Sequence, residues 1–265
     1  MTRLAANLSM LFTEHAFLDR FAAAAQAGFK AVEFLFPYAF EVKQIAEKLQ
    51  ENNLQLILHN LPAGNWEAGE RGIACHPERV DEFRQGVDIA IAYAKALNVT
   101  QLNCLVGIRP ANVSAQEAEQ TLVANLRYAA DKLKAANINL LIEAVNTYDI
   151  PGFFLSGTQQ ALDLIRATGS DNIFVQYDIY HMQRMEGELI NTIKKNLTMI
   201  RHIQLADNPG RFEPGTGEIN YRTIFAALAD MGYQGYQGYQ GWVGCEYKPQ
   251  NGTVAGLGWI KSHGL

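Results

Sequence analysis

Polar residues end four apolar runs of the sequence, each where a buried strand would stop. Three of them are carboxylates and one is an amide: Glu143, Asp178, Gln204 and Glu246. Neighbouring parallel strands lie about 4.8 Å apart, so residues at matching heights on consecutive strands converge on one pocket. A lone acidic residue at a strand end is usually a helix cap or a solvated loop residue. Four polar residues at the ends of successive apolar runs favour a shared site.

Carboxylates brought together in a buried pocket require a positive charge between them. They repel one another, and each is costly to bury without a partner. A bound cation is the simplest source of that charge. An all-oxygen donor set suits Mg²⁺ or Mn²⁺ better than Zn²⁺, which prefers nitrogen and sulfur. We therefore expect one divalent metal ion.

Eight short apolar runs are the candidate strands that position these residues. They lie at residues 4–10, 31–36, 54–59, 101–106, 140–144, 173–177, 202–205 and 242–245. Between them, apolar residues repeat at helical spacing at 17–27, 42–50, 79–97, 115–135, 159–167, 187–197 and 221–229. Strands that alternate with helices predict a parallel sheet.

Eight such units predict an α/β fold, a single (β/α)₈ TIM barrel over residues 1–265. The runs are almost continuously apolar, as expected when both faces of a sheet are covered. A doubly wound fold is the rival, but the turn at residues 11–15 lacks the Gly-x-Gly-x-x-Gly phosphate motif. Catalytic residues of TIM barrels lie at the carboxyl ends of the strands, where the four polar residues are expected.

Composition limits the classes of partner. The net charge is −5 and no Lys or Arg run is present, which argues against nucleic acid. No segment approaches the roughly 20 apolar residues of a membrane span, and no secretion signal opens the chain, so we expect a cytoplasmic protein with no membrane partner. The three cysteines lack Cys-x-x-Cys spacing and indicate reduced core thiols. A homo-oligomer stays open.

Four segments resemble the hydroxypyruvate isomerase family of xylose-isomerase-like barrels. They are Asn-Leu-Ser-Met-Leu-Phe at 7–12, Ala-Val-Glu-Phe-Leu-Phe-Pro at 31–37, Gly-Glu-Ile-Asn-Tyr at 217–221 and Trp-Val-Gly-Cys-Glu-Tyr-Lys-Pro at 242–249. The similarity runs over nearly the whole chain and is nearest to the 2-oxo-tetronate isomerase branch. It implies that Glu143, Asp178, Gln204 and Glu246 are the metal ligands, and that Glu143 and Glu246 also move the proton.

The implied reaction interconverts a 2-oxo-3-hydroxy acid and its 3-oxo-2-hydroxy isomer, such as 2-oxo-tetronate or hydroxypyruvate and tartronate semialdehyde. One proton moves between adjacent carbons through an enediolate. That step needs a base, an acid and stabilisation of the oxyanion. A metal ion that chelates both neighbouring oxygens stabilises the enediolate as a Lewis acid, so no organic cofactor is required.

The substrate is expected to be a small hydroxy-oxo acid, whose carboxylate needs a cationic partner. Arg211 is the preferred clamp, because a guanidinium binds a carboxylate through two hydrogen bonds, and Lys248 is the competitor. His181, three residues after Asp178, is expected to contact a substrate oxygen, as in related sugar epimerases. His59 and Glu70 are further candidates for substrate contact. Surface charges and a structural histidine are the alternatives.

Other functions fit parts of the same pattern. A ketose epimerase or a dehydratase would use the same barrel and site, and fold does not separate them. A metal-dependent endonuclease would need a histidine-rich cluster and a basic surface, and a non-catalytic sugar-acid binding protein would have little use for two glutamates at a metal. The Tyr-Gln-Gly repeat over residues 233–241 is expected to be a catalytically silent insertion before the last strand.

Overall fold

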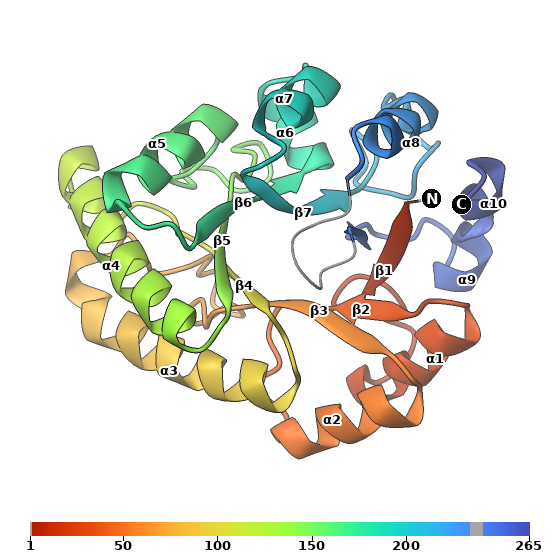
Figure 1. The fold of residues 1–265 in the computed structure, drawn as a ribbon, viewed down its shortest axis with the longest axis horizontal. Coiled ribbons are helices and arrows are strands. Elements are labelled where there is room, and N and C mark those ends of the chain that lie inside the picture. Colours follow the sequence, from red (N-terminus) through yellow and green to blue (C-terminus); the bar gives the residue numbers. More distant parts are fainter. Residues whose placement is uncertain (1, 234–240) are drawn as a thin grey trace. The chain divides into compact units, whose positions relative to one another are not determined.

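The computed structural model describes residues 2–233 and 241–265 and has eight parallel strands (Figure 1). They are β1 (Arg3–Asn7), β2 (Ala31–Glu33), β3 (Gln55–Asn60), β4 (Gln101–Cys104), β5 (Asn139–Glu143), β6 (Ile173–Asp178), β7 (Ile200–Leu205) and β8 (Trp242–Cys245). The strands follow the chain order from β1 to β8 in a closed barrel. The predicted TIM-barrel fold is confirmed.

Helices separate the strands. They are η1 (Phe17–Asp19), α1 (Arg20–Gln26), α2 (Val42–Glu51), η2 (Pro77–Arg79), α3 (Val80–Ala96), α4 (Ala115–Ala135), α5 (Thr158–Thr168), α6 (Ile179–Met185), α7 (Leu189–Asn196), α8 (Tyr221–Asp230), α9 (Thr253–Gly256) and α10 (Gly258–Ser262). Each predicted helical stretch contains a helix. The short helices α6, α9 and α10 were not predicted. No helix among residues 2–233 and 241–265 is long and apolar enough to cross a membrane.

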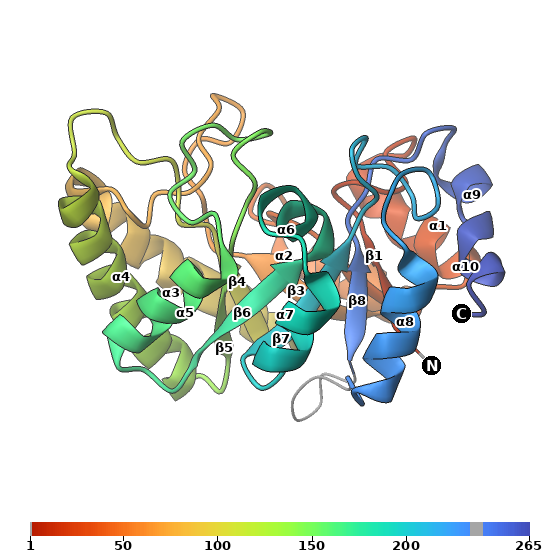
Figure 2. The same ribbon diagram turned by 90° about the horizontal axis from the view of Figure 1, so that it is seen from above.

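The chain forms two compact units, and the first comprises residues 1–57 and 177–265. Within it, β8 pairs with both β1 and β7, as Figure 2 shows for β1 and β8. The register sets Asn7 opposite Glu33 and sets Gly244 opposite Gln204. Aromatic packing secures the last helix, because Phe225 of α8 stacks on Trp259 of α10 with ring centroids 6.1 Å apart.

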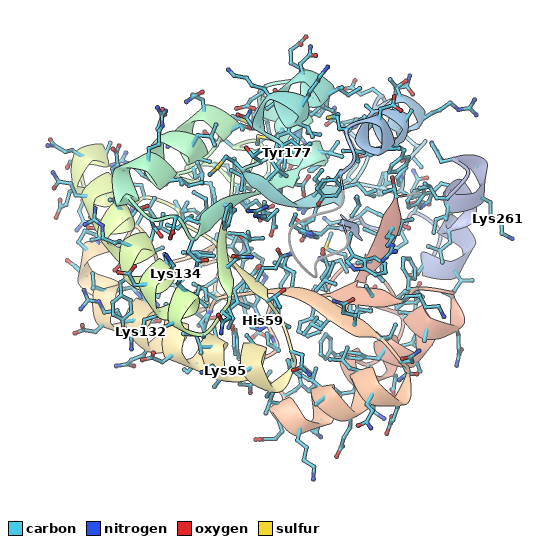
Figure 3. All side chains as sticks on the ribbon, in the orientation of Figure 1. His59, Lys95, Lys132, Lys134, Tyr177 and Lys261 are labelled. Atoms are coloured by element: carbon cyan, nitrogen blue, oxygen red, sulfur yellow. The ribbon has the colours of Figure 1, made fainter. Side chains whose placement is uncertain are left out.

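The second unit comprises residues 58–176. Its strands β4 and β5 pair directly, with α3 and α4 alongside them in Figure 1. Ser114 caps the start of α4, because its Oγ accepts a hydrogen bond from the Glu117 backbone N–H at 3.1 Å. Lys132 and Lys134 of α4 point away from the strands in Figure 3, and Lys132 Nζ lies 3.3 Å from Asp88 Oδ1 of α3.

Three predicted strands, those at 4–10, 31–36 and 101–106, are longer in the sequence pattern than in the structure. The run at 4–10 stops at Asn7, because the backbone N–H groups of Met10 and Leu11 turn back to the Asn7 carbonyl. The run at 31–36 stops at Glu33, and the Leu35 backbone N–H donates to Ser9 Oγ. Apolar character continues past the last ladder hydrogen bond because the loops are buried too.

Glycines follow the C-terminal ends of two helices, α1 and α8. Gly28 and Gly232 have φ values of +99° and +65°, which glycine adopts at little cost. Most of the Tyr-Gln-Gly repeat, residues 234–240, lies outside the described residues, so the prediction of a silent insertion stays a prediction. The single domain over residues 1–265 also stays a prediction.

Candidate functional site

Buried acidic and imidazole groups that could hold a metal ion are found at the predicted strand ends. Among the described residues they are Glu143, Asp178, His181 and Glu246. The last three belong to the first unit, and each has a ligand atom within 4.8 Å of the others. All three are 5% exposed or less.

Asp178 uses its two carboxylate oxygens differently. It is the last residue of β6 and the N-cap of α6, so its Oδ1 accepts a hydrogen bond from the His181 backbone N–H at 3.1 Å. Its Oδ2 is buried without a hydrogen bond from any described residue, and His181 Nε2 lies 3.8 Å from it. A buried carboxylate oxygen without a donor is costly in an apolar interior. A cation at this oxygen would remove that cost.

Glu246 directly follows β8 and is bound at both oxygens. Its Oε2 lies 2.5 Å from Arg211 Nη2, and its Oε1 accepts a hydrogen bond from Asn7 Nδ2 at 3.3 Å. Burial raises the pKa of Glu246 to about 8, and the negative charges of Asp178 and Glu33 act in the same direction, whereas Arg211 lowers the pKa. The side chain is therefore a stronger base than an exposed glutamate.

Arg211 is placed against Glu246 by its loop. The carboxylate of Asp207 folds this loop by accepting four backbone N–H groups, those of Asn208, Gly215, Gly217 and Ile219. The Arg211 carbonyl accepts from the Lys248 backbone N–H at 2.8 Å. The guanidinium also lies over the Tyr180 ring, 5.4 Å from its centroid. Sequence reasoning did not find Asp207 or the ion pair with Glu246.

Replacement of Arg211 tests its predicted role as the substrate clamp. Arg211→Lys should raise KM substantially, because an ammonium does not reproduce two parallel hydrogen bonds to a carboxylate. Lys248→Ala is the matched control, since the Lys248 side chain is exposed. Steady-state kinetics of the wild type, Arg211→Lys, Arg211→Ala and Lys248→Ala would check this. If Arg211→Ala left kcat/KM unchanged while Lys248→Ala abolished it, the two roles would be reversed.

Glu33 is a buried carboxylate that sequence reasoning missed. It ends β2 with no exposed surface and contacts Asn7 of β1 and both His202 and Gln204 of β7. The only sequence signal was an acidic residue between apolar neighbours inside the segment at 31–37. The predicted ligand Gln204 is 1% exposed and donates its amide N–H to Glu33 at 2.8 Å.

Glu143 is held within the second unit by two amides. Its Oε2 accepts hydrogen bonds from Asn103 Nδ2 at 3.0 Å and from Gln176 Nε2 at 2.9 Å, and it is 5% exposed. The register sets Glu143 opposite Gln176 on β6. Two donors on one oxygen restrict the rotation of the carboxylate. Asn103 and Gln176 were not predicted as functional residues.

His59 and Glu70, predicted as substrate contacts, differ in environment. His59, labelled in Figure 3, is completely buried, and burial lowers the pKa of its imidazole to about 4, so the ring is neutral at pH 7. Glu70 pairs with Arg79, accepts from the Asn65 backbone N–H at 2.5 Å and lines a cavity of about 620 Å³ in the second unit. The pairing with Arg79 lowers the pKa of Glu70. Its contact with substrate stays a prediction.

Comparison with known proteins finds relatives over nearly the whole chain. The family model described as xylose isomerase-like TIM barrel matches residues 21–263. The chain is 56% identical to hydroxypyruvate isomerase of Escherichia coli over 98% of both chains. It is 42% identical to 2-oxo-tetronate isomerase of Cupriavidus necator over 99% of both chains.

Solved structures give the same fold. A protein from Brucella melitensis described as an AP endonuclease of family 2 is 44% identical and has a TM-score of 0.93 over 99% of both chains. A D-allulose 3-epimerase from a Methylomonas species has a TM-score of 0.77 at 22% identity and covers 99% of both chains. The second likeness concerns the fold alone.

Proposed function

Because the chain belongs to the xylose isomerase-like TIM barrel family, we propose that it interconverts a 2-oxo-3-hydroxy acid and its 3-oxo-2-hydroxy isomer. Full-length similarity to curated isomerases shows that it is an enzyme of the hydroxypyruvate and 2-oxo-tetronate isomerase type, as predicted. One observation carries the proposal further. Asp178 Oδ2 is buried and accepts no hydrogen bond from any described residue, and Asp178 lies beside the acid–base candidate Glu246.

The proposed ligands of one Mg²⁺ or Mn²⁺ ion are Glu143, Asp178, Gln204 and Glu246. Carboxylate and amide oxygens suit these ions, and the unmatched Asp178 oxygen fits a cation. When bound, the ion supplies Lewis-acid stabilisation of the negative charge that develops on the substrate oxygens. The imidazole of His181 lies in the same buried group and is proposed to contact a substrate oxygen.

Glu143 and Glu246 are proposed to carry the proton. One carboxylate removes the proton from the carbon that bears the hydroxyl group, and the electron pair of that C–H bond forms the enediolate. A protonated carboxyl group then delivers a proton to the neighbouring carbon. The hydroxyl proton passes to the oxygen of that carbon, so the oxo and hydroxy groups exchange places. The hydrogen bonds that each glutamate accepts from an amide restrict its rotation and keep its oxygens aimed at the substrate carbons.

Arg211 is proposed to bind the substrate carboxylate from its position beside Glu246. A guanidinium has five N–H donors, so it can serve a substrate carboxylate and Glu246 together. The Arg211–Glu246 pair also balances the negative charge of Glu246, so this charge repels the substrate carboxylate less.

The proposal is tested with metal-stripped protein. Hydroxypyruvate and 2-oxo-tetronate would each be supplied with Mg²⁺ or Mn²⁺, and kcat/KM would be measured by proton NMR. We expect turnover of at least one acid that is lost without metal and regained with either ion. Turnover that is unaffected by complete metal removal would contradict the metal-dependent reaction.

The same NMR assay separates the competing functions. An epimerised ketose or a dehydrated product would indicate the epimerase or the dehydratase. Metal-dependent cleavage of DNA that contains abasic sites would favour the endonuclease, which the net charge of −5 argues against. The cytoplasmic location remains a prediction.

A further inference from the structure

We propose that Glu33 is a positioning residue that determines which end of the Gln204 amide faces the metal ion and that holds Asn7 against Glu246. The inference rests on the proposed function, because it takes Gln204 as a metal ligand. Glu33 itself touches neither metal nor substrate in this scheme. It acts through two neighbouring amides.

Two amide donors and one imidazole nitrogen lie against the Glu33 carboxylate, and they come from two strands. Its Oε1 accepts hydrogen bonds from Asn7 Nδ2 at 2.9 Å and from Gln204 Nε2 at 2.8 Å. Its Oε2 lies 2.7 Å from His202 Nε2. All four residues are 1% exposed or less, so water does not compete for these contacts. The contacts lie within one compact unit of the chain.

The direction of the Gln204 hydrogen bond follows from the chemistry of its partner. An amide has an oxygen that accepts and a nitrogen that donates, and rotation by half a turn exchanges them. The Oε1 atom of Glu33 accepts this hydrogen bond, so the nitrogen of Gln204 faces Glu33. The Gln204 carbonyl oxygen, on the same carbon, is thereby turned away from Glu33. An oxygen is what a hard cation requires.

Asn7 connects Glu33 to the acid–base residue Glu246 through hydrogen bonds. Its Nδ2 donates to Glu33 Oε1 and also to Glu246 Oε1, at 2.9 and 3.3 Å. Its Oδ1 accepts from the Ser9 backbone N–H at 3.0 Å, which fixes the opposite end of the amide. Asn7 therefore links Glu33 to Glu246, and one carboxylate orients both a proposed ligand and a proposed proton carrier.

Gly244 independently indicates that the structure reserves space for the Glu33 carboxylate. A Cβ atom at Gly244 would overlap both oxygens of Glu33. The residue sits inside β8, and its φ is not in the left-handed region, so the need for glycine here is one of space. β8 therefore has no side chain at the position next to the Glu33 carboxylate.

The test compares variants of the full-length, metal-stripped protein by their Mn²⁺ dissociation constants, measured by electron paramagnetic resonance. Glu33→Met keeps the length of the side chain but removes the acceptor, so Mn²⁺ should bind about 10- to 100-fold more weakly, as when other outer-shell partners are removed. Glu33→Gln can turn its oxygen to Asn7 and Gln204 and its nitrogen to His202, and should retain most of the affinity. If Glu33 only filled space, both variants would keep the wild-type Mn²⁺ affinity.

A double substitution isolates the orientation of the amide. In Gln204→Glu both ends of the side chain are oxygens, so its orientation no longer needs Glu33. With Glu33 present the two carboxylates repel, and the single variant should bind Mn²⁺ poorly. Glu33→Met combined with Gln204→Glu should bind Mn²⁺ more tightly than Glu33→Met alone. Independent effects of the two substitutions would overturn the inference.

Controls separate this idea from unfolding and from the proposed function. Glu47→Met, at an exposed site of α2, should leave Mn²⁺ affinity and kcat/KM unchanged. If Glu33→Met does not fold, as judged by the Tm of the metal-free protein, Gly244→Ala displaces the same carboxylate and should weaken Mn²⁺ binding. Unchanged affinity in the folded variants refutes the role of Glu33 alone. A wild-type protein that neither binds Mn²⁺ nor isomerises refutes the proposed function.

Discussion

Replacement of Glu246 by Gln should lower kcat by at least about 10²-fold, the contribution typical of a general acid or base. The amide keeps the size of the side chain and one oxygen, but it does not take up and release a proton at neutral pH. Glu143→Gln should have an effect of similar size, because each carboxylate is proposed to act at a different carbon. Steady-state isomerase kinetics at saturating metal would measure both effects.

The matched control for these variants is Glu47→Gln, which makes the same chemical change at an exposed position and should leave kcat unchanged. Metal content must be measured in every variant, because the two glutamates are also proposed ligands. Near-normal kcat with full metal content in either Glu143→Gln or Glu246→Gln would refute the assignment of that residue as a proton carrier.

Replacement of Asp178 by Asn should abolish metal binding while it preserves the start of α6. The Asn oxygen can still accept the His181 backbone N–H, and Asn is as good a helix N-cap as Asp. The amide nitrogen then takes the place of Oδ2 and presents N–H donors toward the metal site. We expect Mn²⁺ affinity to fall by more than about 100-fold, beyond the loss seen when only a supporting residue is removed.

Two measurements on Asp178→Asn separate metal binding from folding. The Tm of the metal-free protein should stay close to that of the wild type, and added Mn²⁺ should no longer raise it. Asp163→Asn, on the exposed face of α5, is the control and should behave as wild type in both measurements. If Asp178→Asn kept wild-type Mn²⁺ affinity, Asp178 Oδ2 would not be a ligand.

Local sequence patterns were enough to predict the fold and the strand-end carboxylates. The alternation of apolar runs with helical spacing is a property of short segments, and eight repeats of it indicate a barrel. Glu143, Asp178 and Glu246 stand out because an acidic residue is rare in a buried run, whatever its neighbours in space are. The motif at residues 242–249 indicated the isomerase family without any knowledge of contacts in the structure.

Other features depended on residues that are distant in the chain. The apolar runs at 4–10 and 31–36 did not show where the strands end, because the loops after Asn7 and Glu33 are buried as well. Arg211 was predicted from its charge alone, but its contact with Glu246 depends on a loop folded around Asp207.

The sequence by itself therefore determined the barrel, the isomerase family and the acidic residues at the strand ends, since each of these follows from local periodicity or a local motif. Only the tertiary structure showed that Glu33 meets Asn7, Gln204 and His202 above a glycine of β8. The physical reason is that hydrogen-bond partners of buried side chains, such as Glu33 and Gln204, come from strands that are distant in the chain, in this case 171 residues apart. Burial periodicity within one strand carries no information about such partners.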